Sequence, residues 1–242
     1  MDTPAEPTLP KAARLLWDLD DAGSRGPKRG LSLDRILEAA IAICDADGYS
    51  ALSMSRLAKE LGFTTMSLYR YVDSKDTLAI VLFDRVVGPP PELPTGEGWR
   101  VGLSAWARAE FDYIRLHPWW LDLPLSAPPF GPNNMAWLEV GLQTLAEVPI
   151  PEPLKLQLVT NLSLYVIGRA KFIRDSTLQA ADEFDYAAML AEVLDPARYP
   201  LVSHAMTSRA FEADDMDWDI ADFDFALDRL LDGYEQFIVK HT

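Results

Sequence analysis

The chain has 242 residues and 49% of them are hydrophobic, so it can bury a sizeable core in one large domain or two smaller ones. Its formal net charge of −15 argues against binding nucleic acid over the whole surface. No apolar run reaches the roughly 18–20 residues that cross a membrane, and the N-terminus lacks the basic-then-apolar layout of a signal peptide. We therefore expect a globular cytoplasmic protein with no membrane partner.

The first 30 residues are predicted to form an N-terminal arm. It is proline-rich at first, then shows a short amphipathic piece around residues 12–19. Glycine and proline prevent regular structure in the next segment, RGPKRG, whose cations can adhere to phosphate. These cations are Arg25, Lys28 and Arg29. Two interpretations stay open: a basic arm that reaches a neighbouring minor groove, and a solvated linker.

Residues 32–47 are predicted to form the first long helix, capped by Ser32 and closed by Gly48. Its inward side carries Cys44, the single cysteine of the chain. A lone cysteine cannot form an internal disulfide, which fits a reducing cytosol. Because a reactive thiol needs a cationic and accessible setting, we expect Cys44 to be a buried structural thiol rather than a redox sensor.

Residues 53–75, SMSRLAKELGFTTMSLYRYVDSK, carry the most informative pattern of the chain. They are predicted to form two short helices joined by a tight turn at Gly62, where a helix end favours positive φ. Ser53 can cap the first helix, and Thr64 or Thr65 can cap the second. This layout is typical of a helix-turn-helix, whose second helix enters the DNA major groove.

The second of these helices is expected to display a face suited to DNA. Leu68 and Val72 lie one turn apart and face inward. Arginine commonly contacts guanine edges or phosphate, and a tyrosine hydroxyl contacts phosphate. The opposite, outward face then carries Thr65, Met66, Tyr69 and Arg70.

The charge of this part of the chain differs from that of the whole. Residues 24–75 carry eight cations and six anions, a net charge of +2, so the remainder carries −17. Salt screens interactions beyond about 10 Å, so the acidic remainder does not prevent local binding to phosphate. The next helix is predicted at 75–87 with Ser74 as its cap. A phosphate at that end would suit both the helix dipole and the ammonium of Lys75.

Residues 31–87 resemble the DNA-binding head of TetR-type transcriptional repressors. The resemblance rests on an acidic-Gly-aromatic step at 47–49, Leu-Ala…Leu-Gly at 57–62, and Ser-Leu-Tyr-Arg-Tyr-Val…Lys at 67–75. The run MSLYRYV and the ending FALDRLLDGYEQFI are similar to the tetracycline-repressor-like branch. The resemblance implies an all-α fold, with a three-helix helix-turn-helix head and a larger helical domain for ligand binding and dimerisation.

DNA contacts are expected from both helices of the motif and from the start of the next helix. Arg70 and Thr65 would face base edges, and Thr64 and Met66 belong to the same predicted surface. The remaining predicted contacts go to the phosphate backbone, from Ser67, Tyr69, Tyr71 and Lys75, with Ser55 and Arg56 on the preceding helix.

Gly88 and the three prolines that follow end the helix at 75–87 and mark the best domain boundary. We expect a DNA-binding domain at 31–88, called the head below, and a second domain at 89–242. The second domain shows no convincing strand pattern and no internal repeat. Asn133 or Asn134 is expected to cap one of its helices. The helices predicted there are 99–116, a short element at 119–123, one from about 133 to 147, 151–177, 184–194 and 223–240, with an irregular stretch from 196 to 220.

The helices at 151–177 and 223–240 are each apolar over more than one stripe, which is typical of helices buried on more than one side. In the resembled family this region pairs with its twin in a four-helix dimer interface. Two-fold symmetry would also double the readout of a palindromic operator. We therefore expect a homodimer through these helices, with a monomeric core as the alternative.

Aromatic and polar side chains of the second domain suggest a pocket for a small-molecule effector, whose identity the sequence does not give. Ligand cavities combine aromatic walls with a few polar groups. Each candidate could instead be an ordinary core residue, and His117 could simply cap the preceding helix. The candidates are Trp106, Phe111, His117, Trp119, Trp120, Trp137, Asn161, Tyr165 and Arg169.

Metal and enzyme interpretations find little support. The three histidines, His117, His204 and His241, lack the spacing of metal ligands. An aspartate run from 215 begins like a calcium loop, but Ile220 stands where that loop needs glycine and Ala226 where it needs glutamate. We interpret residues 214–224 as a solvated connection.

No GxSxG, P-loop or dinucleotide motif is present, so we expect no enzyme, no cofactor and no metal. The favoured hypothesis is a ligand-responsive repressor that binds double-stranded operator DNA as a dimer. Two alternatives remain: a small-molecule binding protein whose head is vestigial, and an enzyme on an all-helical scaffold.

Overall fold

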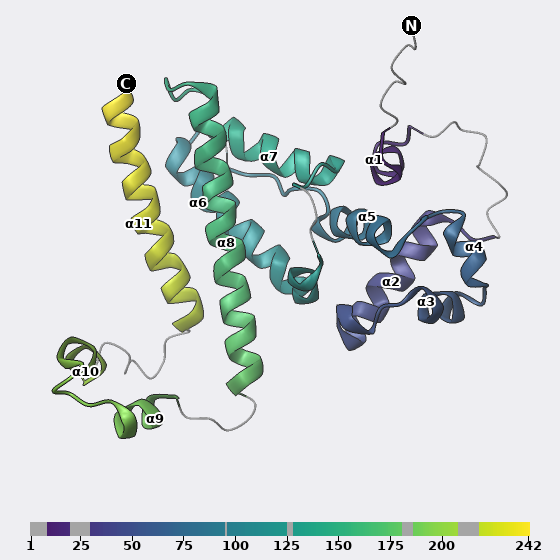
Figure 1. Cartoon of the computed structure of the whole chain (residues 1–242). Helices are drawn as coiled ribbons and strands as arrows, with labels where there is room; N and C mark the ends of the chain where they lie inside the picture. The colour runs from purple at the N-terminus through teal and green to yellow at the C-terminus, as the bar shows by residue number, and fades with distance from the viewer. Residues whose placement is uncertain (1–8, 20–29, 95, 125–127, 181–185, 208–217) are drawn as a thin grey trace, which may run out of the picture.

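The structure, a computed structural model, describes residues 9–19, 30–94, 96–124, 128–180, 186–207 and 218–242. Within these residues every regular element is helical, which confirms the predicted all-α class (Figure 1). The elements are α1 Lys11–Leu16, α2 Leu33–Asp47, the 3₁₀ turn η2 Tyr49–Ala51, α3 Met54–Leu61, α4 Thr65–Tyr69, α5 Lys75–Val87, α6 Trp99–Leu116, the 3₁₀ turn η3 Pro118–Asp122, α7 Pro132–Thr144, α8 Glu152–Ala180, α9 Tyr186–Val193, α10 Pro200–Thr207 and α11 Trp218–His241.

The head, residues 31–88, holds α2 to α5 around a small apolar core. Ile36, Leu57 and Leu68 come from three different helices, and each is fully buried. Leu82 on α5 is equally buried, so α5 completes this core while running toward the second domain (Figure 1). Cys44 is also buried, and burial raises the pKa of its thiol to about 11, as expected of a structural cysteine.

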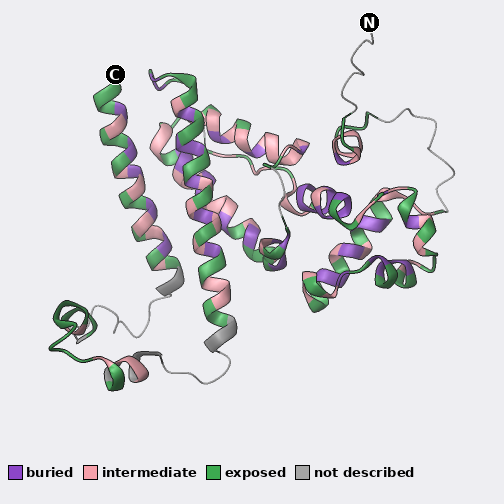
Figure 2. Cartoon of the chain, in the orientation of Figure 1, coloured by how far each residue is buried: buried purple, intermediate pink, exposed green. Residues whose placement is uncertain are grey.

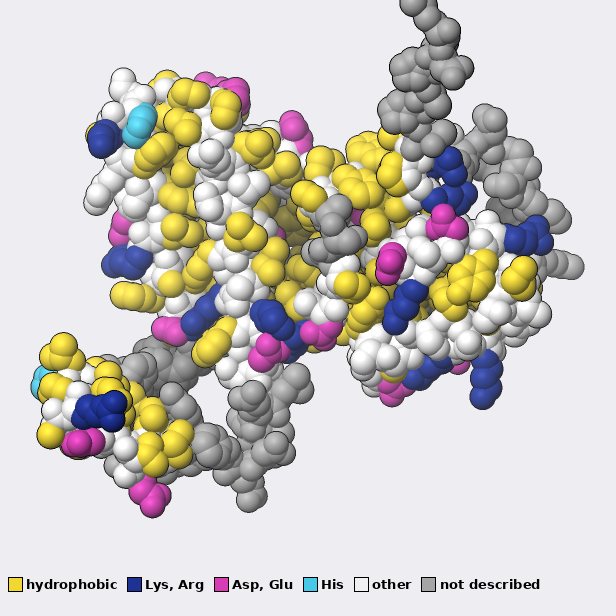
Figure 3. All heavy atoms as spheres, in the orientation of Figure 1, with side chains coloured by type: hydrophobic (Ala, Val, Ile, Leu, Met, Phe, Trp, Pro, Cys, Tyr) yellow, Lys and Arg dark blue, Asp and Glu magenta, His cyan; other side chains and the backbone are white. Residues whose placement is uncertain are grey.

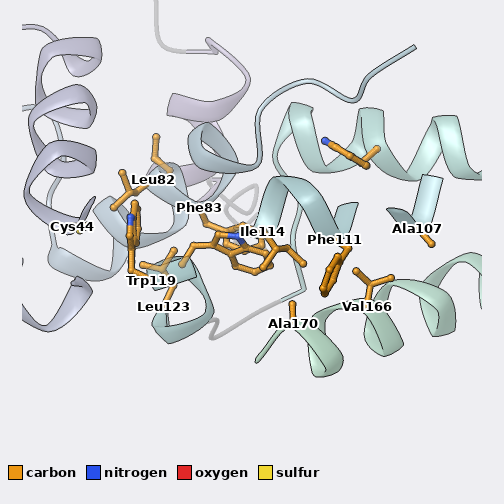
Figure 4. Packing of buried hydrophobic residues seen from close by; sticks show 14 of the residues in the cluster. Cys44, Leu82, Phe83, Ala107, Phe111, Ile114, Trp119, Leu123, Val166 and Ala170 are labelled. Atoms are coloured by element: carbon orange, nitrogen blue, oxygen red, sulfur yellow. The ribbon is translucent and has the colours of Figure 1, made fainter. Parts of the chain in front are cut away.

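The second domain is built around a helical bundle of α6, α7, α8 and α11. Phe111 on α6 stacks on Phe223 of α11, with ring centroids 4.3 Å apart. Val166 and Ala170 of α8 are buried close to Phe111 (Figure 4). Buried residues recur along one side of α8 and α11, while exposed residues occupy the other (Figure 2). Helices α9 and α10 lie apart from this bundle (Figure 1).

Helix α7 begins differently from the sequence prediction. Its N-cap is Gly131 and makes no side-chain cap, so the expected cap by Asn133 or Asn134 is wrong. Both asparagines lie inside the first turn and bind Asp84 of α5 instead. A Cβ at Gly131 would lie 2.2 Å from the Asp84 carboxylate oxygen Oδ1, so the close approach of that carboxylate favours glycine there.

The predicted irregular stretch from 196 to 220 is also wrong in part, because it contains α10 and the first residues of α11. Leu201 on α10 is 82% exposed, so this helix has no buried apolar stripe from which periodicity could be read. Proline at the start of α10 suits a helix beginning. Asp215 and Asp217 of the aspartate run lie outside the described residues.

The N-terminal segment contains a packed helix in addition to the predicted arm. Ala12 on α1 is buried, and α1 packs against α5 of the head. Just after α1, the indole Nε1 of Trp17 donates a hydrogen bond to the Phe130 carbonyl at 3.0 Å. The basic residues of the arm, Arg25, Lys28 and Arg29, lie outside the described residues.

Candidate DNA-binding surface and effector cavity

The predicted helix-turn-helix forms through local hydrogen bonds. The hydroxyl of Ser53 accepts the Arg56 backbone N–H at 3.1 Å and begins α3. Gly62 ends α3 with φ of 74° in the left-handed region, and the next N–H, of Phe63, donates to the carbonyl of Ala58 at 2.9 Å. Thr64, rather than Thr65, then caps α4 by accepting the Ser67 N–H.

Helix α4 turns its apolar side inward and its functional candidates outward. Leu68 and Val72 are fully buried in the head. Met66 is 74% exposed and Tyr69 43% exposed, and Arg70 is exposed as well. In the part of the chain that the structure describes, no ion pair engages the Arg70 guanidinium. The outward orientation predicted for Met66, Tyr69 and Arg70 is therefore confirmed, whereas Thr65 is half-buried.

Other predicted DNA-contact residues are exposed but already have a neighbour within the head. Arg56 pairs with Asp47, the last residue of α2. The ammonium of Lys75 lies 4.9 Å from the centre of the Tyr49 ring. Both contacts are near the surface, where such interactions contribute little stability and can exchange for a phosphate. Ser55 is exposed on α3, so it remains accessible.

Tyr71 does not lie on the outward face with its neighbours. It is half-buried, and its hydroxyl donates a 2.5 Å hydrogen bond to the carbonyl of Leu31, just before α2. The hydroxyl proton that would bind a phosphate is therefore used inside the head. In this structure Tyr71 fixes the chain that enters α2.

The Lys and Arg side chains of the head are spread over its surface, as Figure 3 shows on the right of the view.

A cavity of about 390 Å³ lies between α5 of the head and the helical bundle of the second domain. Its walls come from α5, η3, the loop before α7, and helices α6, α7 and α8. Three of the predicted pocket residues, Trp106, Trp120 and Trp137, line it. The lining residues that α5 contributes are Phe83, Val86 and Val87.

The other predicted pocket residues lie elsewhere. Aromatic packing or long-range pairing engages most of them, and a hydrogen bond within its own helix engages Asn161. The spacing along a helix does not show which side a distant partner covers. The Phe111 ring stacks on the Phe223 ring, and His117 Nδ1 lies 2.7 Å from Asp45 Oδ1 in the head. The Asn161 amide donates a hydrogen bond to the Gln157 carbonyl, and the Tyr165 hydroxyl donates one to the Phe223 carbonyl. Arg169 forms an ion pair with Asp222. Trp119, also considered, donates to Asp45 at 2.6 Å.

Sequence reasoning missed the cavity's ionisable wall residue, Glu110 on α6. Its carboxylate oxygen Oε1 accepts a 2.5 Å hydrogen bond from the hydroxyl of Ser163 on α8. Burial raises the pKa of Glu110 to about 7. A signal was available, because Glu110 stands one turn from both Trp106 and Ile114, on the apolar stripe of the helix.

The cavity and the head share α5, and a buried carboxylate fixes α5 to the bundle. Asp84 accepts the backbone N–H groups of Asn133 and Asn134 at the start of α7. The side-chain amide of Asn134 donates to the same carboxylate at 2.7 Å. An anion at a helix N-terminus is stabilised by open N–H groups and the helix dipole. Asp84 therefore connects α5 to the start of α7, and both helices line the cavity.

The described residues contain no group of three or more His, Cys, Asp or Glu side chains arranged to hold a metal ion. None of their helices has the length and apolar character needed to cross a bilayer. The geometry thus defines a helix-turn-helix protein with a helical ligand-binding domain.

Comparisons with known proteins agree with this class. Residues 36–82 match the family model of bacterial regulatory proteins of the tetR family, and residues 90–238 match the tetracyclin repressor-like C-terminal domain. The HTH-type transcriptional repressor DrrR1 of Streptomyces coeruleorubidus is 36% identical, over 99% of this chain and 90% of that protein. An HTH-type transcriptional regulator of Saccharopolyspora erythraea is 34% identical, over 90% of each protein.

Solved structures give the same result. The Streptomyces coelicolor TetR family protein ActR in complex with actinorhodin superposes with a TM-score of 0.71 and 26% identity, over 85% of this chain and 95% of that one. ActR in complex with (S)-DNPA gives a TM-score of 0.69 and 25% identity, over 88% of this chain and 100% of that one. The chain belongs to the TetR family, and it is a ligand-responsive transcriptional repressor with a tetracycline-repressor-like second domain.

Proposed function

We propose that the chain represses transcription as a homodimer bound to a palindromic operator. The observation that carries this proposal is the outward face of α4, where Met66, Tyr69 and Arg70 are exposed on the second helix of a helix-turn-helix. Arg70 and Thr65 contact base edges. Ser67, Tyr69 and Lys75 hold phosphates, with Ser55 and Arg56 from α3.

The dimer face that we propose is the outward side of α8 and α11. On α8, Leu164 and Phe172 are exposed, and Gly168 lies midway between them with open space above it. On α11, Phe225 and Val239 are exposed, and Gly233 between them also has open space above it. Glycine lets two helices approach closely, so these stripes suit packing against a second copy.

The apolar residues of α8 and α11 divide into a buried group and an exposed group. In the predicted helices 151–177 and 223–240, Leu158, Leu162 and Val166 of α8 are buried within the bundle of the single chain, as is Leu227 of α11. These residues form the core, whereas Phe225 is 63% exposed. Exposed apolar residues in a row mark interaction surfaces. The proposed interface therefore uses the second apolar stripe of each helix.

The effector site that we propose is the cavity between α5 and α8. ActR has been solved with two different small molecules, actinorhodin and (S)-DNPA, which supports a small-molecule ligand in this fold. An effector that binds the conformation unable to bind DNA shifts the population toward it by its differential affinity. Because α5 lines the cavity and also packs in the head, that shift changes the distance between two heads.

Fluorescence anisotropy with labelled DNA from upstream of the protein's own coding sequence tests operator binding. We expect tight binding at low salt and a steep loss of affinity as salt rises, because counterions are released from phosphates. No binding at low salt would favour the alternative, a small-molecule binding protein with a vestigial head.

Sedimentation velocity tests the dimer face. Phe172→Glu places a charge in the proposed interface and should convert the dimer to monomer. The matched control is Leu201→Glu, which introduces the same charge at an exposed leucine of α10, away from the stripes. A dimer that persists in Phe172→Glu, or that is lost equally in both variants, would contradict this interface.

A further inference from the structure

Glu110 is an ionisable group in the cavity wall. It stands in the middle of α6, and its oxygen Oε1 accepts the hydroxyl of Ser163 at 2.5 Å. The other oxygen, Oε2, is enclosed and has no hydrogen-bond partner among the described residues. A buried carboxylate oxygen without a partner is costly unless a ligand provides one.

The surroundings of Glu110 do not neutralise it. The described lining residues, from α5, η3, the loop before α7, and helices α6, α7 and α8, include no lysine, arginine or histidine. Burial raises the pKa of Glu110 to about 7, and the hydrogen bond from Ser163 acts in the opposite direction. The carboxylate thus lacks a counterion within an otherwise apolar cavity.

Three polar side chains of the wall are already engaged. Asn134 donates to Asp84, and the Thr160 hydroxyl donates to the carbonyl of Leu156 on its own helix. Ser163 is held by Glu110 itself. Glu110 Oε2 is therefore the open carboxylate oxygen of the wall to which a bound molecule can donate, and the hydroxyl of Tyr113 is a further polar group there.

We propose that Glu110 is the recognition group for the effector, and that the effector is an aromatic molecule carrying a protonated amine. This inference rests on the proposed role of the cavity as the effector site. The carboxylate supplies the counterion for the ammonium, and the indole rings of Trp106 and Trp137 provide flat apolar walls with faces that attract cations. A neutral ligand of the same shape would leave the carboxylate without a counterion.

The pairing predicts a pH dependence of binding. Near pH 7 the empty protein holds Glu110 partly protonated, and an ammonium requires the ionised form. Affinity for an amine that stays protonated should therefore rise with pH, on the order of 30-fold from roughly pH 5.5 to 8. A neutral ligand should not show this rise.

The test uses two probes that differ in one group, anthracenylmethylamine and anthracenylmethanol. Energy transfer from the cavity tryptophans to anthracene reports binding to the full chain. Wild type should bind the amine at least about tenfold more tightly than the alcohol at roughly pH 8, and Glu110→Gln should remove this preference while the alcohol binds as before. Asp112→Asn is the matched control, because it removes one exposed carboxylate from the same helix and should keep the preference.

Equal affinity for the two probes in wild type, or a preference that survives in Glu110→Gln, would overturn the assignment of Glu110. Failure of both probes to bind would overturn the assignment of the cavity to aromatic amines. Operator binding by the same preparations, measured without any probe, shows separately whether the proposed repressor function stands.

Discussion

The head and the cavity are built by different kinds of interaction. In the head, Ser53, Gly62 and Thr64 begin or end helices through hydrogen bonds to residues three to five positions away. The cavity instead collects side chains from segments as distant as Phe83 and Ile167. Local hydrogen bonds can be inferred from neighbouring residues, whereas a cavity wall depends on how distant helices pack.

The functional polar groups of the two regions also differ in their exposure. Arg70 is exposed on α4, so DNA can reach it without any change in the head. Glu110 is enclosed among apolar side chains, so its charge is costly until a ligand binds. Helix α5 is common to both regions. Substitutions in each region should therefore have separate effects, except at residues that hold α5 to the bundle.

Asp84→Ala should have the largest effect, because it acts on this shared helix. The buried carboxylate accepts N–H groups from Asn133 and Asn134, and its loss leaves the start of α7 without a partner. We expect a loss of about 3 kcal/mol or more in the free energy of unfolding, measured by urea denaturation. The control is Asp34→Ala, whose exposed pair with Arg85 also involves α5 and should contribute less than about 1 kcal/mol. Similar losses of unfolding free energy for the two variants would show that Asp84 does not stabilise the contact between α5 and α7 more than an exposed ion pair does.

Glu110→Gln should come next and should depend on pH. The pKa of Glu110 is about 7 in the folded chain, above its value of 4.5 in the unfolded chain, so the folded state binds more protons between these values. The free energy of unfolding of wild type should therefore fall relative to the variant from about pH 4.5 to 7, by on the order of 3 kcal/mol in total. Asp112→Asn should show no such trend. A pH-independent difference between wild type and Glu110→Gln would mean that burial does not perturb this carboxyl.

Tyr71→Phe should have the smallest effect, and it separates the two possible roles of this residue. Removing the hydroxyl deletes the hydrogen bond to the Leu31 carbonyl, which should cost about 1 kcal/mol of stability. Operator affinity should stay close to that of wild type when the protein is fully folded. A clear loss of affinity with unchanged stability would restore the phosphate contact that the sequence predicted.

These contrasts explain how much the sequence could predict. Ser32, Ser53 and Gly62 predicted the boundaries of the head helices, because caps act over a single turn. The outward face of α4 followed from the spacing of Leu68 and Val72. In the cavity, three of the tryptophans that the sequence named line the wall, and their role in binding a ligand stays a prediction.

The errors arose where distant partners decide the outcome. Arg169 was a pocket candidate, but Asp222 of α11 pairs with it. Asn133 was a cap candidate, but its amide reaches Asp84, which lies 49 residues away in the chain. Glu110 was passed over because a single carboxylate on an apolar stripe has no local partner that marks it. No rule of spacing within one helix identifies such contacts.

The most direct measurement is operator affinity of Arg70→Ala across a salt series, beside Lys59→Ala as a control. Both variants remove one exposed cation of the head, but Lys59 lies on α3, outside the outward face of α4. We predict that Arg70→Ala loses about 1–3 kcal/mol of binding free energy and discrimination at one operator position. Lys59→Ala should retain that discrimination. If Arg70→Ala bound the operator as tightly and as selectively as wild type, the outward face of α4 would not be the DNA-reading surface.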